Sequence, residues 1–211
     1  SAEWQQLSPS TQTVRRRILD RFCAEHGDKP YRLLEARHDR HMRDAMADRP
    51  EAANNWLKIL KRLYGWAQEY EHVTHNPVAD VRKIRTASTG HHTWTVEEVR
   101  QFQETHPLGT KASLALDLLL YTGVRRSDVV KLGPQLVRDG WLYFTETKGA
   151  NRKPKQREIP ILPPLQESID AAPSGHLAYL VTAYGQPHTE EGFGNWFKKQ
   201  CRRAGLEHCT A

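Results

Sequence analysis

A polar segment near the middle of the chain constrains its organisation most. From Arg85 to His92 the sequence reads Arg-Thr-Ala-Ser-Thr-Gly-His-His, without the periodic apolar residues that build a helix or a strand. Small polar residues in such a run are typical of a linker. The sequence therefore predicts two domains, residues 1–85 and 93–211, joined by a linker at residues 86–92.

The first domain has the periodicity of helices. Ser8-Pro9 is a helix-start signal, and Gly27 is a stop signal. A later stripe that includes Trp56 and Leu60 marks a long helix that is central to its domain. Together these signals predict helices over residues 9–26, 38–47 and 50–70, and a short helix after Pro77 that ends near Ile84.

The second domain combines both periodicities. Helical patterns are expected over residues 95–102, 111–121 and 127–132, after Pro164, and from Thr189 to a stop at Ala204-Gly205. Between them, the turn signal Asp139-Gly140 precedes a strand at Trp141–Thr145, and another strand is expected at 157–161. The predicted fold class is mainly α with a small antiparallel β-sheet (α+β).

Composition narrows the class of partner. The formal net charge of +6 favours a polyanion such as nucleic acid, although many basic proteins bind none. Cys23, Cys201 and Cys209 are odd in number and show no Cys-x-x-Cys spacing, which favours a reduced cytoplasmic protein without disulfides or a zinc site. The longest apolar run, near Leu114–Tyr121, is too short to span a membrane.

The most informative segment runs from Leu118 to Leu132. An apolar helix breaks at Gly123, and Arg125 stands at the start of the next helix. A guanidinium fixed there can bind two phosphate oxygens, and the helix start adds positive potential. Asp128 could hold Arg125 or Arg126 in place. From spacing alone, however, a surface Arg–Asp pair of little energetic value is the favoured interpretation.

The same segment resembles the first catalytic box of the tyrosine recombinases, or phage integrases. That box reads Thr-Gly-x-Arg, then Ser, then an acidic residue and an apolar helix face, as Thr122–Leu132 does. The resemblance implies that Arg125 contacts the scissile phosphate and that Asp128 orients it. Asn76–Ala79 and Thr93–Val99 resemble flanking segments of the family. The likeness therefore covers nearly the whole chain and implies a helical, SAM-like core-binding domain followed by the N-terminal portion of a catalytic domain.

A second segment, Phe144–Gly149, resembles the strand end that carries the family's catalytic lysine. The resemblance implies that Lys148 is the general acid that protonates the leaving 5′ oxygen. Other basic residues are expected to contact the DNA backbone; they are Arg15, Arg16, Arg126, Arg152, Lys153 and Lys155. The alternative for this group is a solvated basic face.

The family's chemistry is transesterification through a phosphotyrosine intermediate, which needs no metal and no cofactor. The implied partners are double-stranded DNA and further protomers in a DNA-bound tetramer, with no membrane and no small-molecule substrate. The expected location is the cytoplasm, and the expected origin is bacterial or phage. Ala204–Ala211 resembles the lead-in to the family's later His-x-x-Arg box, and no tyrosine here has the nucleophile's context. We therefore expect a chain that ends before that box and binds DNA without cleaving it.

Two other interpretations stay open: a noncatalytic DNA-binding module of the same fold, and a helical nucleic-acid adaptor unrelated to recombinases. His38 and His41 have a spacing compatible with a metal, but a surface pair is the better account because no third ligand is evident. His91 and His92 fall in the predicted linker and are expected to be inert. No metal site is predicted.

Overall fold

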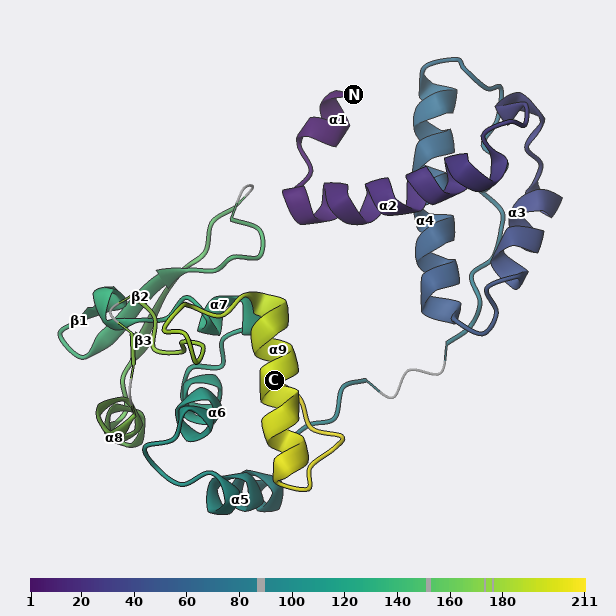
Figure 1. Ribbon diagram of the computed structural model, residues 1–211. Coiled ribbons are helices and arrows are strands. Elements are labelled where there is room, and N and C mark those ends of the chain that lie inside the picture. The colour runs from purple at the N-terminus through teal and green to yellow at the C-terminus, as the bar shows by residue number, and fades with distance from the viewer. Residues whose placement is uncertain (87–89, 151–152, 173, 176) are drawn as a thin grey trace. The chain divides into compact units, whose positions relative to one another are not determined.

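The protein forms two compact units. The computed structural model describes residues 1–86, 90–150, 153–172, 174–175 and 177–211 (Figure 1). The units are Ser1–Thr89 and Gly90–Ala211, and each has its own apolar core. Their boundary falls within the segment predicted as a linker, of which residues 87–89 lie outside the described residues.

The first unit is helical throughout. Its elements are α1 (Ala2–Gln5), α2 (Pro9–His26), the 3-10 turn η1 (Tyr31–Leu33), α3 (Ala36–Asp44) and α4 (Pro50–Glu69). Both α2 and α3 pack against α4, which carries most of the core (Figure 1). Trp56, Leu60 and Tyr64 are buried on α4, so the predicted apolar stripe does face the interior. The helices predicted at 9–26, 38–47 and 50–70 are confirmed to within three residues.

The prediction of a short helix after Pro77 is wrong. Residues 77–80 form turns, and residues 81–86 have no regular structure. The side chain of Asn76 accepts a hydrogen bond from the N–H of Val78 (3.0 Å), which favours a turn over a helix start. Further on, the Asn54 side chain on α4 bonds both the N–H and the carbonyl of Ile84, each at 2.9 Å. These contacts satisfy the Ile84 backbone groups without a helix.

The second unit combines five helices with one sheet in its described part. The helices are α5 (Val96–Thr105), α6 (Lys111–Thr122), α7 (Arg126–Val129), α8 (Pro163–Ala171) and α9 (Glu190–Arg203), with a 3-10 turn η2 (Pro134–Leu136). The strands β1 (Val137–Arg138), β2 (Trp141–Thr145) and β3 (Gln156–Pro160) pair antiparallel in the order β1-β2-β3. Leu142 pairs with Ile159, which sets the register of β2 and β3. The predicted fold class is confirmed.

Helix α6 lies at the centre of the second core. Leu114 and Leu118 on α6 are fully buried, in one cluster with Phe193 and Phe197 of α9. Helix α8 also packs on α6. Thr110 caps the start of α6 through its side-chain oxygen. None of the described helices, including this apolar one, has the length and hydropathy needed to cross a membrane.

Candidate phosphate-binding site

The end of α6 determines where Arg125 lies. Gly123 closes the helix in the left-handed conformation (φ +60°), and its N–H donates to the carbonyl of Leu119. Glycine adopts this conformation without the penalty that a Cβ brings. Two residues later Arg125 is the N-cap of α7, and its side chain is 48% exposed. The predicted placement of an arginine between a broken apolar helix and the next helix is therefore observed.

Glu146 holds this arginine. It follows β2 directly, and its side chain is only 8% exposed. One carboxylate oxygen, Oε2, accepts a hydrogen bond from Nη1 of Arg125 at 2.7 Å. The other, Oε1, accepts one from Nε of Arg157 on β3 at 2.6 Å. The two guanidinium groups, Arg125 first, lower the pKa of Glu146, and Glu146 in turn raises the pKa of Arg125. One carboxylate thus fixes two arginines that come from different elements.

Asp128 connects α7 to the same strand end. Its side chain is 2% exposed, and Oδ1 accepts the backbone N–H of Thr147 at 2.7 Å. Its other oxygen lies 4.0 Å from Nη1 of Arg125, so Glu146 makes the closer ion pair. Lys131 adds a second link by donating to the Thr147 hydroxyl at 2.8 Å. Asp128 therefore positions the turn after β2, and sequence reasoning missed the role of Glu146 in positioning Arg125.

Lys148 lies in that turn. It is exposed and stands two residues after Glu146, next to the anchored Thr147. Lys153 and Lys155, predicted to bind DNA, are also exposed on the connection between β2 and β3. Arg152 belongs to the same prediction but lies outside the described residues. The described lysines of this hairpin thus lie on the β2–β3 connection, which begins with Glu146, the residue that binds Arg125.

The remaining predicted DNA contacts are in other places. Arg126 forms an ion pair with Glu190 at the start of α9 (3.3 Å), and its guanidinium lies so close to Gly194 that a Cβ there would displace it. Arg15 and Arg16 lie on α2 in the first unit. The Arg16 guanidinium stands over the Trp4 ring, 5.6 Å from its centroid.

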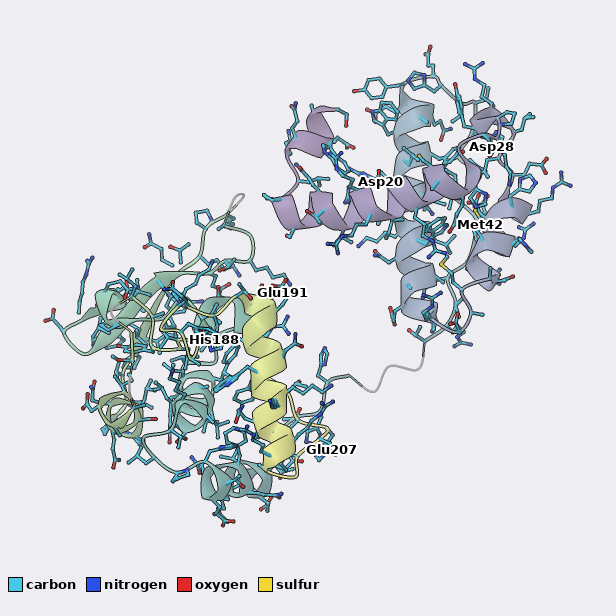
Figure 2. The ribbon with its side chains drawn as sticks, in the orientation of Figure 1. Asp20, Asp28, Met42, His188, Glu191 and Glu207 are labelled. Atoms are coloured by element: carbon cyan, nitrogen blue, oxygen red, sulfur yellow. The ribbon has the colours of Figure 1, made fainter. Side chains whose placement is uncertain are left out.

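A hollow lies beside the anchored turn. Its volume is about 420 Å³, and its lining includes Ser127 and Lys131, the turn residue Thr147, and His188 before α9. Figure 2 labels Glu191 in the first turn of α9 and His188 on the segment that precedes the helix. Burial, with a smaller contribution from Lys111, lowers the pKa of His188. The neutral imidazole at this place is therefore favoured near neutral pH.

The arrangement around Arg125 can bind an anion. Glu146 accepts a hydrogen bond from Nη1 of the guanidinium, and the half-exposed side chain keeps other N–H donors accessible to a ligand. The guanidinium is oriented by a nearly buried partner rather than free on a flexible stem, which reduces the entropy lost on binding. The exposed cations of the hairpin add positive charge without a described acidic residue between Lys148 and Lys155. This combination suits a phosphate group of a polyanion.

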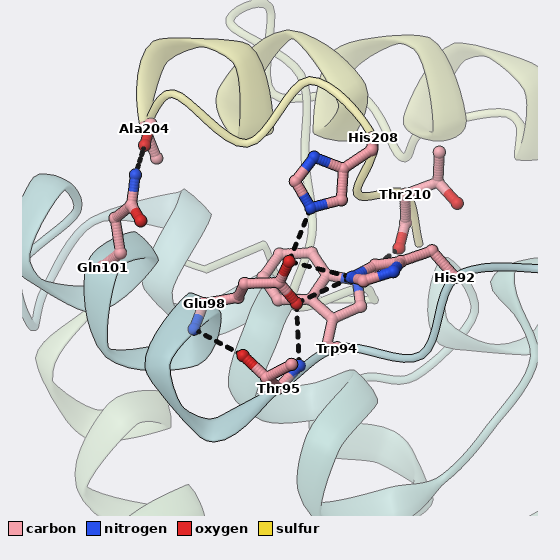
Figure 3. A network of polar contacts seen from close by, with 8 residues as sticks. All are labelled: His92, Trp94, Thr95, Glu98, Gln101, Ala204, His208 and Thr210. Atoms are coloured by element: carbon pink, nitrogen blue, oxygen red, sulfur yellow. Dashed lines mark hydrogen bonds and ion pairs between the residues drawn. The ribbon is translucent and has the colours of Figure 1, made fainter.

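A second polar cluster was not predicted from the sequence. The Glu98 carboxylate on α5 is hydrogen-bonded to Nε2 of His92 (2.7 Å) and to Nε2 of His208 (2.5 Å), as Figure 3 shows. Cys209 lies beside them. The sequence predicts an inert His92 within the linker and no metal-ligand spacing among the cysteines, whereas the structure brings His92 and Cys209 together with Glu98 and His208. No local pattern could have found this cluster, because 110 residues separate Glu98 from His208.

Comparison with known proteins places the fold. No known family profile matches the chain, and no curated protein matches it by sequence. Among solved structures, a lambda integrase (residues 75–356) dimer bound to a COC′ core site superposes with a TM-score of 0.80 at 17% identity, over 95% of this chain and 73% of that one. A lambda integrase tetramer bound to a Holliday junction gives 0.80 at 18% identity, over 95% of this chain and 62% of that one.

A transposon protein gives a similar result. The Tn1549 integrase (residues 82–397) in complex with circular intermediate DNA superposes with a TM-score of 0.72 at 18% identity, over 96% of this chain and 75% of that one. The chain spans 59% of the length of another lambda integrase chain that it matches. At these identities the likeness is one of fold. Over 95% of its length, this chain folds as the lambda integrase chains do.

Proposed function

We propose that this protein is a tyrosine recombinase that binds double-stranded DNA and acts in site-specific recombination or integration, by cutting and rejoining strands through a phosphotyrosine intermediate. The observation that carries the proposal is the position of Arg125. Its half-exposed guanidinium is fixed by Glu146 where α6 gives way to α7. The surrounding fold is shared with integrases solved in complex with DNA.

Each side chain has a distinct role in the proposed reaction. Arg125 binds the scissile phosphate and stabilises the charge that develops on its oxygens in the transition state. Lys148 donates a proton to the leaving 5′ oxygen. Glu146 and Asp128 position these two groups, because Glu146 binds Arg125 and Asp128 holds the turn that carries Lys148. The attacking tyrosine is not among the residues that we assign, and we expect the 211 residues alone to bind DNA without forming an adduct.

The proposal assigns a different role to each of the two units. The first unit, with Arg15 and Arg16 on α2, acts as the core-binding domain, and the second contributes part of the catalytic domain. Lys153, Lys155, Arg126 and Arg152 contact backbone phosphates, which fixes the register of the protein without reading sequence. Lambda integrase has been solved as a dimer and as a tetramer on DNA, and we propose further protomers as partners here too.

The test is a covalent trap. The protein in its full natural length is mixed with a nicked duplex that carries its recombination site, so that a cleaved strand cannot be rejoined. We expect a protein–DNA adduct that survives denaturing gel electrophoresis, and we expect Arg125→Ala to abolish it. Arg138→Ala is the matched control, because Arg138 is exposed on β1 and has no assigned role.

The outcomes separate the candidates. An adduct that Arg125→Ala leaves unchanged would show that the assignment of Arg125 is wrong. Duplex binding without any adduct, for the full-length protein on its own site, would instead support a noncatalytic DNA-binding module of the same fold.

A further inference from the structure

Four side chains of metal-binding type converge in the second unit, away from Arg125. They are His92, Glu98, His208 and Cys209, and one ligand atom of each lies within 4.8 Å of all the others. In Figure 3 the Glu98 carboxylate bonds Nε2 of both imidazole groups. The imidazole rings meet edge to face, with their centroids 4.6 Å apart. Cys209 is fully buried, whereas His92 and His208 are exposed.

The chemistry of this set selects a class of metal. Two imidazoles, one thiol and one carboxylate are ligands of Zn²⁺, while Mg²⁺ and Ca²⁺ prefer oxygen alone. With zinc–ligand bonds of about 2.0–2.3 Å, tetrahedral ligand atoms lie about 3.3–3.8 Å apart. The present separations of 2.5 Å (His208 to Glu98) and 2.7 Å (His92 to Glu98) are those of hydrogen bonds. The ligand atoms therefore need to move by only about 1 Å to receive the ion.

The surrounding contacts fix the ligands before any metal arrives. The Glu98 carboxylate also accepts the N–H of Thr95 at 2.7 Å, as part of a capping box at the start of α5. The Trp94 indole donates to the carbonyl of Thr210 at 3.0 Å, and Gln101 donates to the carbonyl of Ala204 at 2.5 Å. Hydrogen bonds behind the ligands are a regular feature of protein metal sites, because they hold the ligand groups in orientation.

Charge also favours a divalent cation. One contribution opposes a metal ion: the start of α5 carries a positive partial charge. Two negatively charged ligands outweigh it. The Glu98 carboxylate, together with the thiolate that Cys209 becomes on binding, supplies two negative charges that neutralise Zn²⁺. No described arginine or lysine has an ion pair with Glu98.

We propose that His92, Glu98, His208 and Cys209 form a structural Zn²⁺ site. With four protein ligands the ion has no open position for a substrate, so the site is not catalytic. It joins the segment that enters α5 to the segment that follows α9, two segments 110 residues apart at Glu98 and His208. Closing so long a loop stabilises the second unit. The inference does not depend on the proposed function.

Cobalt provides the test, since Co²⁺ in a tetrahedral site with a thiolate gives strong ligand-field bands and a sulfur-to-cobalt charge-transfer band. The tag-free 211-residue chain, reduced and stripped of metal, is titrated with Co²⁺ and then with Zn²⁺. We expect one Co²⁺ per chain with both spectral features, and displacement by Zn²⁺. Cys209→Ser should remove the charge-transfer band, while Cys23→Ser, at an exposed cysteine of the first unit, should leave it intact.

A second pair of variants covers the case in which Cys209→Ser fails to fold. His92→Ala should weaken Zn²⁺ binding by more than about tenfold, and His91→Ala should not. Glu98→Gln keeps an acceptor for the Thr95 N–H but removes the charge, and it should weaken binding as well. Zn²⁺ should raise the melting temperature of the unaltered chain and of the control variants Cys23→Ser and His91→Ala, and should raise that of His92→Ala and Glu98→Gln less. A cobalt spectrum without a thiolate band, or equal Zn²⁺ affinity for His92→Ala and His91→Ala, would overturn the proposal.

Discussion

Two nearly buried carboxyl groups illustrate how a single residue changes the stability of this chain with pH. Asp39 on α3 is fully buried, and neither of its oxygens has a hydrogen-bond partner within the described part of the chain. Burial raises the pKa of Asp39 to about 6. Glu146 has two arginine partners, and its pKa is lowered. Ionisation therefore opposes folding at Asp39 and favours it at Glu146.

Replacing Asp39 by asparagine should stabilise the first unit at neutral pH. Since the folded-state pKa lies above the ordinary value of 3.8, the cost of ionising Asp39 grows as the pH rises from 3.8 to about 6. That interval corresponds to about 3 kcal/mol at most. We expect the advantage of Asp39→Asn over the unaltered chain to grow by about 1–3 kcal/mol between acid and neutral pH. Urea unfolding, followed at several pH values across this range, measures it.

The control for this prediction is Asp48→Asn. Asp48 is an exposed residue of the same unit that pairs with Arg49 on the surface. Its substitution should leave the pH dependence nearly unchanged, because exposed ion pairs contribute little. If the stability difference for Asp39→Asn stays constant with pH, the buried carboxyl is not ionising as described.

Glu146→Gln should have the opposite pH signature. Because the folded-state pKa lies below the ordinary 4.5, the stabilising contribution of Glu146 is fully present above pH 4.5. It is lost as the pH falls through the lowered folded-state pKa. The variant should therefore be less stable than the unaltered chain at neutral pH, and the difference should shrink in acid. Thermal unfolding of both chains at neutral and acidic pH measures this; a difference that widens in acid would contradict it.

At the scale of elements, the ends of helices decide where functional groups lie. Helix α6 must stop at Gly123 for Arg125 to begin α7. Helix α5 begins with a full capping box in which Thr95 and Glu98 satisfy each other's backbone N–H groups. Helix α4, by contrast, continues through Gly65 without a break. The same residue type thus has opposite roles at positions 123 and 65.

This contrast predicts that the same substitution, glycine to alanine, changes stability in opposite directions at the two positions. Gly123→Ala should destabilise the second unit by about 1 kcal/mol, because an alanine at φ +60° is strained although space around it is open. Gly65→Ala should stabilise the first unit by about 0.5–1 kcal/mol, because alanine is the better residue inside a helix. Its Cβ would lie 3.6 Å from the Asn76 side chain, an ordinary contact. Denaturant unfolding of each variant measures both values, and equal signs would refute the argument.

At the scale of the whole molecule, net charge bears on the proposed binding of DNA. The chain has 31 basic and 25 acidic residues, hence a net charge of +6. Some of the basic side chains are held by carboxylates, as Arg125 and Arg157 are by Glu146. Others on the hairpin, such as Lys148 and Lys153, are exposed and have no described ion pair. Exposed cations of this kind contribute most to binding that depends on salt.

We expect the affinity of the 211-residue chain for duplex DNA to fall steeply as salt rises, because each phosphate contact releases a bound counterion. Lys148→Ala and Lys153→Ala should each reduce the slope of log affinity against log salt by about 1. Lys199→Ala, an exposed lysine of α9 outside the predicted contacts, serves as the control. Fluorescence anisotropy over a range of salt concentrations gives the slopes. Affinity that does not depend on salt would contradict the phosphate contacts.

The sequence by itself determined the elements whose signals are local. Capping residues, apolar stripes and turn residues act over three to four positions, so α2, α4, α5, α6 and the β2–β3 pair could be predicted from them. The prediction of a short helix that ends near Ile84 was wrong because local signals did not determine that segment. The backbone of Ile84 is hydrogen-bonded to the side chain of Asn54, which lies 30 residues away and cannot be identified from a local pattern.

Only the tertiary structure decided which charged groups meet. Arg125 could be placed at a helix start from the sequence, but its partner Glu146 lies 21 residues further on, and the pairing exists because β2 ends beside α7. The cluster of His92, Glu98, His208 and Cys209 depends even more on the fold. Interactions between distant residues are set by how helices and strands pack, and packing is a property of the whole unit rather than of any segment.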